Sequence, residues 1–292
     1  MKEYMIMNDF HTNPEHWFRP APNTNLNDIC GMEDLRRELK SRADSLTAPI
    51  RSKINPGTPS ALLFYGPPGA GKTFYAQAFA RELTDKGYMY MHVNICDLLS
   101  CYVGETEKNI DLLFRTAIEH APCVLVIDDL DEICRNRCSP LLKYHEHSCT
   151  NAVLYGYSKM RDFGADVVLI GISSFPWNVD AALTDKMESL CIPFPDDICR
   201  AGYLQAQLRM LNPEQEVLDL LTRRTAGSSF RHLRQIAKSI REQVCKQLTD
   251  VTDPKSIDPI LLCPTLAMAE QALHDNPMKS DAHYLRQLEA YR

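Results

Sequence analysis

The stretch "GPPGAGKT", residues 66–73, decides the fold. It matches G-x-x-x-x-G-K-[ST] in full, follows an apolar run at 61–65 that predicts a buried strand, and opens a helix predicted over 73–87. Such a loop turns backbone N–H groups toward a phosphate, and the helix N-terminus adds the positive end of its dipole. Lys72 is expected to reach the β- and γ-phosphates of ATP, and Thr73 to ligate Mg²⁺. The predicted nucleotide-binding residues are Gly66, Pro67, Pro68, Gly69, Ala70, Gly71, Lys72 and Thr73.

A second acidic stretch, "CVLVIDDLDEI" at 123–133, fits a Mg²⁺-holding strand end. Four apolar residues run into Asp128 about 55 residues after the phosphate loop, and Asp128 is expected to hold Mg²⁺ through water. The next position usually carries a glutamate that polarises the attacking water, but here it is Asp129. Aspartate keeps the charge and is one methylene shorter, so its carboxylate is expected to reach less far.

Composition narrows the class of protein. The chain has 292 residues, 45% hydrophobic and 24% charged, with a net charge of −6. No basic field is available to hold phosphate backbones, so nucleic acid is not expected as the main ligand. The 11 cysteines are scattered in apolar runs and are expected to be buried free thiols. The sequence shows neither a signal-peptide pattern nor 18 consecutive apolar residues, so we expect no membrane span and a cytoplasmic protein.

Strand and helix patterns alternate through the first two thirds of the chain, which predicts a parallel sheet covered on both faces. After about residue 196 the strand patterns stop and helical spacing continues. The expected fold class is α/β, a P-loop NTPase domain with a parallel sheet followed by a small all-helical lid. We expect an N-terminal arm at 1–27 anchored by Trp17 and Phe18, the α/β domain at 28–196 and the lid at 197–292.

From Asn25 onward the sequence resembles the AAA ATPases of the wider AAA+ group. The segment "NTNLNDICGMEDLRREL" is similar to the family's stretch beside the adenine, which implicates Ile29 and Gly31. The segment "LLSCYVGETEKNIDLLFRTA" is similar to the one carrying the first pore loop, with Tyr102 and Val103 as the substrate-gripping pair. The tail "TLAMAEQALHDNPMKSDAHYLRQLEAYR" resembles the last lid helices of the katanin- and spastin-like branch.

The resemblance implies a ring, most often a hexamer, that binds ATP between subunits and pulls a protein substrate through its pore. A homo-oligomer or a mixed ring with a sister subunit is expected. The segment "SSFRHLRQI" places Arg231 where some branches carry a lid arginine that touches the γ-phosphate. It is similar to the lid of the pachytene-checkpoint remodellers, which implies a HORMA-domain partner and, through bacterial relatives, a role in anti-phage defence.

Three positions depart from the family's catalytic pattern: Asp129, Ser174 at the usual sensor asparagine, and a stretch before "CIPFP" that offers Lys186 where arginines are usual. An arginine finger raises kcat by a factor of about 10³ to 10⁵, which corresponds to roughly 4 to 7 kcal/mol of activation free energy. Lysine supplies a point charge without the planar fork of arginine. We expect a slow or partner-activated ATPase. Two alternatives stay open: a nucleotide-binding pseudo-ATPase scaffold, and a protein like the helicase loaders, some of which tolerate Asp-Asp here.

A cysteine- and histidine-rich stretch, "CRNRCSPLLKYHEHSC" at 134–149, raises a further alternative. Its residue types could bind zinc, but its C-x₃-C and H-x-H-x-C spacings match no common structural site. The resemblance places a polar second pore loop here. The candidate zinc ligands are Cys134, Cys138, His145, His147 and Cys149.

Overall fold

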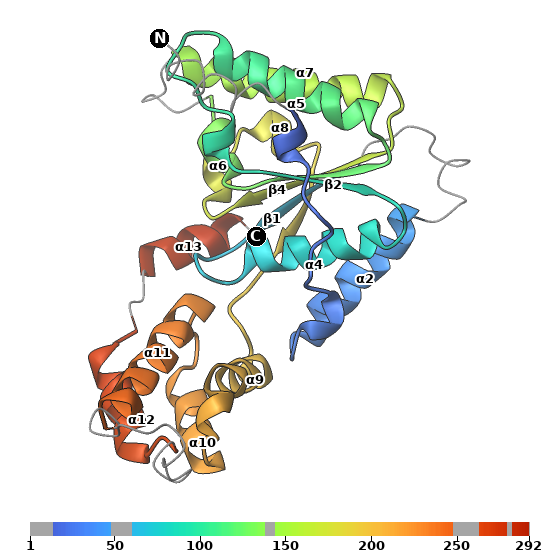
Figure 1. The fold of residues 1–292 in the computed structure, drawn as a ribbon. Coiled ribbons are helices and arrows are strands. Elements are labelled where there is room, and N and C mark those ends of the chain that lie inside the picture. Colours follow the sequence, from blue (N-terminus) through green and yellow to red (C-terminus); the bar gives the residue numbers. More distant parts are fainter. Residues whose placement is uncertain (1–13, 48–59, 138–143, 248–262, 279–281, 292) are drawn as a thin grey trace, which may run out of the picture.

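The computed structural model describes residues 14–47, 60–137, 144–247, 263–278 and 282–291 (Figure 1). Its centre is a five-stranded sheet in the order β2-β3-β4-β1-β5, and every strand pair is parallel. The strands are β1 (Ser60–Tyr65), β2 (Met89–Val93), β3 (Cys123–Ile127), β4 (Val167–Ser173) and β5 (Glu188–Cys191).

Helices cover both faces of this sheet (Figure 1). Alternate residues of β1 enter opposite cores, since Leu62 belongs to the core on one face of the sheet and Leu63 to the core on the other. The central strands β3 and β4 are buried along their whole length, as expected for strands covered on both faces. The main helices of this part are α2 (Glu33–Thr47), α4 (Lys72–Thr84), α5 (Glu105–Glu119) and α7 (Tyr144–Asp162). Short helices are η1 (Pro14–Trp17), η2 (Leu26–Asp28), η3 (Ile95–Asp97), α6 (Leu130–Ile133), η4 (Pro176–Asn178) and α8 (Ala181–Thr184).

Four helices after the sheet form a separate core around residues such as Leu204, Leu221 and Ile236. They are α9 (Asp197–Leu208), α10 (Gln215–Arg224), α11 (Phe230–Gln247) and α12 (Leu266–Asp275), with η5 (Arg209–Leu211) between the first two. The last helix, α13 (Ala282–Tyr291), instead lies beside the sheet, where Tyr284 and Leu288 join the core shared by β1 and β3 (Figure 1).

The predicted fold class, a parallel α/β sheet followed by a helical lid, is confirmed. The pattern missed one strand, β5, because this short segment reads as a loop between charged and polar residues. The division of the chain at residues 27 and 196 stays a prediction. Among the helices in the described ranges, none combines the length and apolar character needed to span a bilayer.

The N-terminal arm is fastened to the edge of the sheet. Trp17 is only 3% exposed and belongs to the main core. Phe18 pairs with Met91 in an antiparallel bridge, and the Arg19 amide donates to the carbonyl of Tyr90 at 3.0 Å. The arm thereby covers an otherwise open strand edge, which protects β2 from pairing with another chain.

Candidate nucleotide site

The phosphate loop lies between β1 and α4 and has a backbone that requires glycine. Gly66 has φ +153°, and a Cβ there would lie 2.1 Å from the carbonyl oxygen of Ile192. Gly71 has φ +91° and precedes the first residue of α4. The positive end of this 13-residue helix therefore faces the loop.

Lys72 is folded back onto the loop. Its side chain is 7% exposed, and Nζ donates to the carbonyls of Gly66 at 2.9 Å and Pro67 at 3.1 Å. Burial lowers the pKa of Lys72 to about 8, although nearby Asp128 and Asp131 favour its charged form. Among the described residues, the ammonium thus hydrogen-bonds to carbonyl oxygens and to no carboxylate, an arrangement suited to an arriving phosphate anion.

Asp128 lies at the end of β3 against the first turn of α4. Thr73 Oγ1 donates to Asp128 Oδ2 at 3.0 Å, and His92 Nε2 on the neighbouring strand lies 3.8 Å from the same oxygen. Burial raises the pKa of Asp128, but the nearby His92 imidazole and the hydrogen bond from Thr73 outweigh it and hold the pKa below its usual range.

This pair of hard oxygen atoms, one of them ionised, fits Mg²⁺. Thr73 and Asp128 would hold the ion, as predicted from the sequence. Mg²⁺ bound there would neutralise charge that develops on the phosphates.

Asp129 follows in a conformation that is uncommon for a non-glycine residue. It has φ +52°, lies in the left-handed region and is exposed. Partial burial raises the pKa of Asp129, and the adjacent charge of Asp128 raises it further. In the described part of the chain, no side chain donates a hydrogen bond to its carboxylate. The carboxylate is therefore available to a water molecule at the open side of the site.

Ser174, the predicted sensor, directly follows β4 and is half-buried. Its carbonyl accepts a hydrogen bond from the Tyr284 hydroxyl at 2.6 Å. Asp131 is a further carboxylate close to Lys72 and is 6% exposed. Burial raises its pKa, although nearby Ser173 opposes this rise, and its buried Oδ1 has no hydrogen-bond partner among the described residues.

The lid contacts the phosphate loop directly. The Phe230 amide donates to the carbonyl of Gly69 at 3.0 Å, and a Cβ on Gly69 would lie 3.0 Å from that of Arg231. The guanidinium charge of Arg231 is also one of the influences on the pKa of Lys72. The structure therefore brings Arg231 beside the phosphate loop.

Ile29 and Gly31 lie beside the start of α9. Ile29 is buried, and Gly31 has φ +71° with no room for a side chain, since a Cβ would lie 2.5 Å from Asp196 Oδ1. The Met32 amide donates to Asp196 Oδ2 at 2.8 Å, and Asp196 also caps α9. The predicted adenine-side segment is thus fastened to the start of the lid.

Three predicted residues lie on the surface, apart from the phosphate loop. Tyr102 is 63% exposed and Val103 is fully exposed, on the loop that ends at the Gly104 cap of α5. Lys186 is exposed, and its Nζ donates to the carbonyl of Ala182 at 3.0 Å. Within one chain the structure does not join these residues to the site. Their predicted roles need a neighbouring subunit or a substrate.

The zinc alternative is not resolved. In the described ranges, no group of three or more His, Cys, Asp or Glu residues is placed to hold a metal ion. Cys134 and Cys149 are buried and His147 is half-buried. Cys138 and the side chain of His145 lie outside the described residues, so the five-residue set cannot be assembled from the structure.

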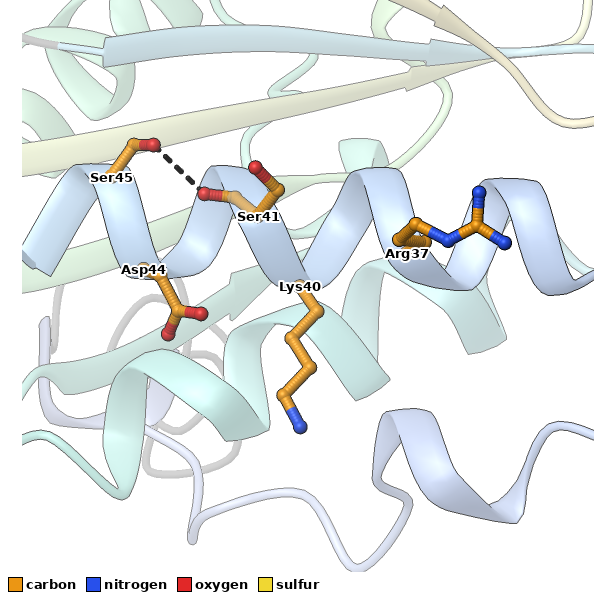
Figure 2. A pocket seen from close by; sticks show the side chains of 5 residues that line it. All are labelled: Arg37, Lys40, Ser41, Asp44 and Ser45. Carbon is orange, nitrogen blue, oxygen red and sulfur yellow. Dashed lines mark hydrogen bonds between the residues drawn. The ribbon is translucent and has the colours of Figure 1, made fainter.

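A shallow pocket lies elsewhere, along the surface of α2 (Figure 2). Its lining comes from a single helix, and within it the Ser45 hydroxyl donates to the carbonyl of Ser41 at 2.8 Å. Ligand sites usually gather polar groups from several elements, so we assign this pocket no function. The lining residues are Arg37, Lys40, Ser41, Asp44 and Ser45.

The part of the chain that forms this candidate nucleotide site matches a known protein family. Residues 62–192, which hold the phosphate loop and the acidic strand end, match the family described as "ATPase family associated with various cellular activities (AAA)". Residues 62–192 form an AAA domain. The family resemblance expected from the sequence is thereby confirmed.

Relatives of the AAA domain include vacuolar protein sorting-associated protein 4B of Pongo abelii and 4A of Homo sapiens. Each is 27% identical over 246 residues, which is 81% of this chain and 53% and 54% of the relatives. The chain thus spans about half the length of the curated relatives it matches. The crystal structure of the FIGL-1 AAA domain superposes with a TM-score of 0.76 at 20% identity, covering 97% of this chain and 94% of that one, which shows a shared fold.

Sequence reasoning missed three residues of the site: His92, Asp131 and Tyr284. A single histidine in an apolar strand and a tyrosine near the C-terminus carry no pattern that points to a nucleotide. Asp131 could have been suspected from its place two residues after Asp129 in the acidic stretch. His92 and Tyr284 are found only when the fold brings distant segments together.

Proposed function

We propose that this chain is an ATP hydrolase with low intrinsic turnover that drives the remodelling of a protein substrate. The observation that supports hydrolysis best is the 3.0 Å hydrogen bond between Thr73 and Asp128, next to the buried ammonium of Lys72. These groups come from two strand ends and one helix start, and together they form a charged phosphate site beside a pair of metal-binding oxygens.

Each residue of the proposed site has a role in ATP binding or hydrolysis that follows from its chemistry. Lys72 binds the β/γ-phosphates, and Arg231 adds positive charge from the lid. Asp129 orients the attacking water and accepts its proton, and its short side chain and the missing arginines keep turnover low. Ser174 offers a hydroxyl toward the same water or phosphate.

Substrate handling is proposed for the exposed loop at Tyr102 and Val103. An exposed aromatic beside an exposed aliphatic residue can grip an extended polypeptide without sequence preference. A ring of subunits would bring several such loops together and would place Lys186 near a neighbour's nucleotide. The hexamer, the HORMA-domain partner and the anti-phage role are proposed from the sequence resemblance. The cytoplasmic location is proposed from the scattered cysteines, which fit a reducing compartment.

The pseudo-ATPase scaffold remains the second candidate, because three catalytic positions are weakened together. Phosphate release, ATP-analogue binding and light scattering, each with Mg²⁺, separate the two. An ATPase should release phosphate steadily, and its assembly should grow with ATP by mass action. Binding and assembly without phosphate release would favour the scaffold, and no binding would refute both.

A further inference from the structure

Tyr284 lies where two neighbouring strands separate. Tyr65 and Ser173 are the last paired residues of β1 and β4, and the chains diverge at Gly66 and Ser174. The Tyr284 hydroxyl is 2.9 Å from the carbonyl oxygen of Gly66 and 2.6 Å from that of Ser174. It therefore connects the phosphate loop to the sensor position through a residue of α13.

The ring and the hydroxyl of Tyr284 make separate contacts. The ring packs edge-on against Phe175 at 5.6 Å and Trp177 at 5.2 Å. On the same helix, Tyr291 packs edge-on against Tyr65 at 5.2 Å. Aromatic contacts thus dock α13, so removal of the Tyr284 hydroxyl alone should leave the helix in place.

The Tyr284 hydroxyl carries one proton, which it shares between the two carbonyls, and the Ser174 carbonyl is the nearer acceptor. The Gly66 carbonyl also accepts from Lys72 Nζ at 2.9 Å, so it keeps a donor without Tyr284. The same hydroxyl holds the backbone at Ser174, whose side chain is expected near the attacking water.

We propose that Tyr284 is a positioning residue that fixes Ser174 relative to the phosphate loop and so makes hydrolysis depend on docking of the C-terminal helix. The inference rests on the proposed ATPase function. Tyr284 acts through Ser174 and Gly66 and is not proposed to contact the nucleotide.

The test compares Tyr284→Phe with Tyr291→Phe in the full chain. Both substitutions remove one hydroxyl from α13 and keep the ring. Tyr284→Phe should lower kcat about tenfold, the size expected for one lost hydrogen bond in the reacting state. It should change the Kd for ADP less than about threefold, because ADP does not depend on the sensor position. Amide exchange over 173–176 should become faster. Tyr291→Phe should leave all three quantities unchanged.

Two results would overturn the proposal. One is unchanged kcat and unchanged amide exchange in Tyr284→Phe. The other is an equal loss in both variants, which would show a general effect of α13 packing. If the wild-type protein releases no phosphate, the proposed ATPase fails on its own. Amide exchange over 173–176 then still decides whether Tyr284 holds the Ser174 backbone.

Discussion

Lys72 should limit the stability of the protein when nucleotide and Mg²⁺ are absent. Its pKa falls from 10.5 to about 8, and one unit is worth about 1.36 kcal/mol, so its buried charge costs about 3 kcal/mol. Lys72→Met keeps the chain length and removes the charge. It also leaves the Pro67 carbonyl without this donor, at a cost of about 1 kcal/mol. At pH 7 we therefore expect the free energy of unfolding of Lys72→Met to exceed that of wild type by about 2 kcal/mol, which raises the Tm by about 4 to 8 °C.

The pH dependence follows from the same shift. Between about pH 8 and 10.5 the unfolded chain binds more protons at this lysine than the folded protein does, so wild-type stability from this group rises with pH. The advantage of Lys72→Met should therefore be full below pH 8 and should shrink toward pH 10.5. Differential scanning fluorimetry at pH 7 and pH 9.5 measures both effects, with Lys238→Met, whose side chain is 70% exposed, as a neutral control.

The same variant should lose ATP binding, because the β/γ charge would have no ammonium partner. Two results would refute the conclusion that the buried charge of Lys72 destabilises the protein. One is a Lys72→Met protein that is less stable than wild type at pH 7. The other is a stability gain of Lys72→Met that does not shrink as the pH rises. Retained affinity for a fluorescent ATP analogue would refute the role of Lys72 in phosphate binding.

Three other changes test separate parts of the structure. Trp17→Ala should lower the free energy of unfolding by about 3 to 5 kcal/mol in urea denaturation, because a core residue that is 3% exposed is lost; a loss below about 1 kcal/mol would mean that the arm is not anchored. His92→Phe should weaken Mg²⁺-dependent nucleotide affinity about tenfold in calorimetry and leave Mg²⁺-free affinity unchanged, since outer-shell partners tune metal sites by that amount; equal losses with and without Mg²⁺ would contradict this. Tyr102→Ala should keep ATP turnover within about twofold while substrate remodelling is lost, because the side chain is exposed and lies outside the phosphate site; loss of both activities would make Tyr102 structural.

The sequence predicted much of the fold because its signals are local. Each of the first four strands is an apolar run, and the phosphate loop specifies its own strand, turn and helix. The short strand β5 was missed because four residues, ESLC, are too few to show an alternation of apolar and polar side chains. Its pairing with β1 depends on the rest of the sheet.

The candidate site was predictable where one motif holds it and unpredictable where distant segments meet. Lys72, Thr73 and Asp128 follow from spacing alone. The contact of His92 with Asp128 depends on which strand lies beside β3, and the contact of Tyr284 with Gly66 spans 218 positions in the chain. No local pattern encodes such contacts.

Asp129, the proposed base, offers the sharpest test of whether the site performs chemistry. Its carboxylate is exposed, lies next to Asp128 and has a backbone in the left-handed region, which aims the side chain differently from an ordinary strand residue. Asp129→Asn keeps the shape and removes the charge, so it removes any catalysis that depends on a carboxylate base. Asp129→Glu restores the missing methylene and should raise turnover.

Steady-state phosphate release at saturating Mg²⁺-ATP, measured for wild type and Asp129→Asn side by side, tests the proposed ATPase most directly. We predict a low but measurable wild-type rate that falls by at least about 100-fold in Asp129→Asn, while both proteins bind an ATP analogue with similar affinity. Equal rates in the two proteins would show that Asp129 takes no part in hydrolysis and would favour the nucleotide-binding scaffold.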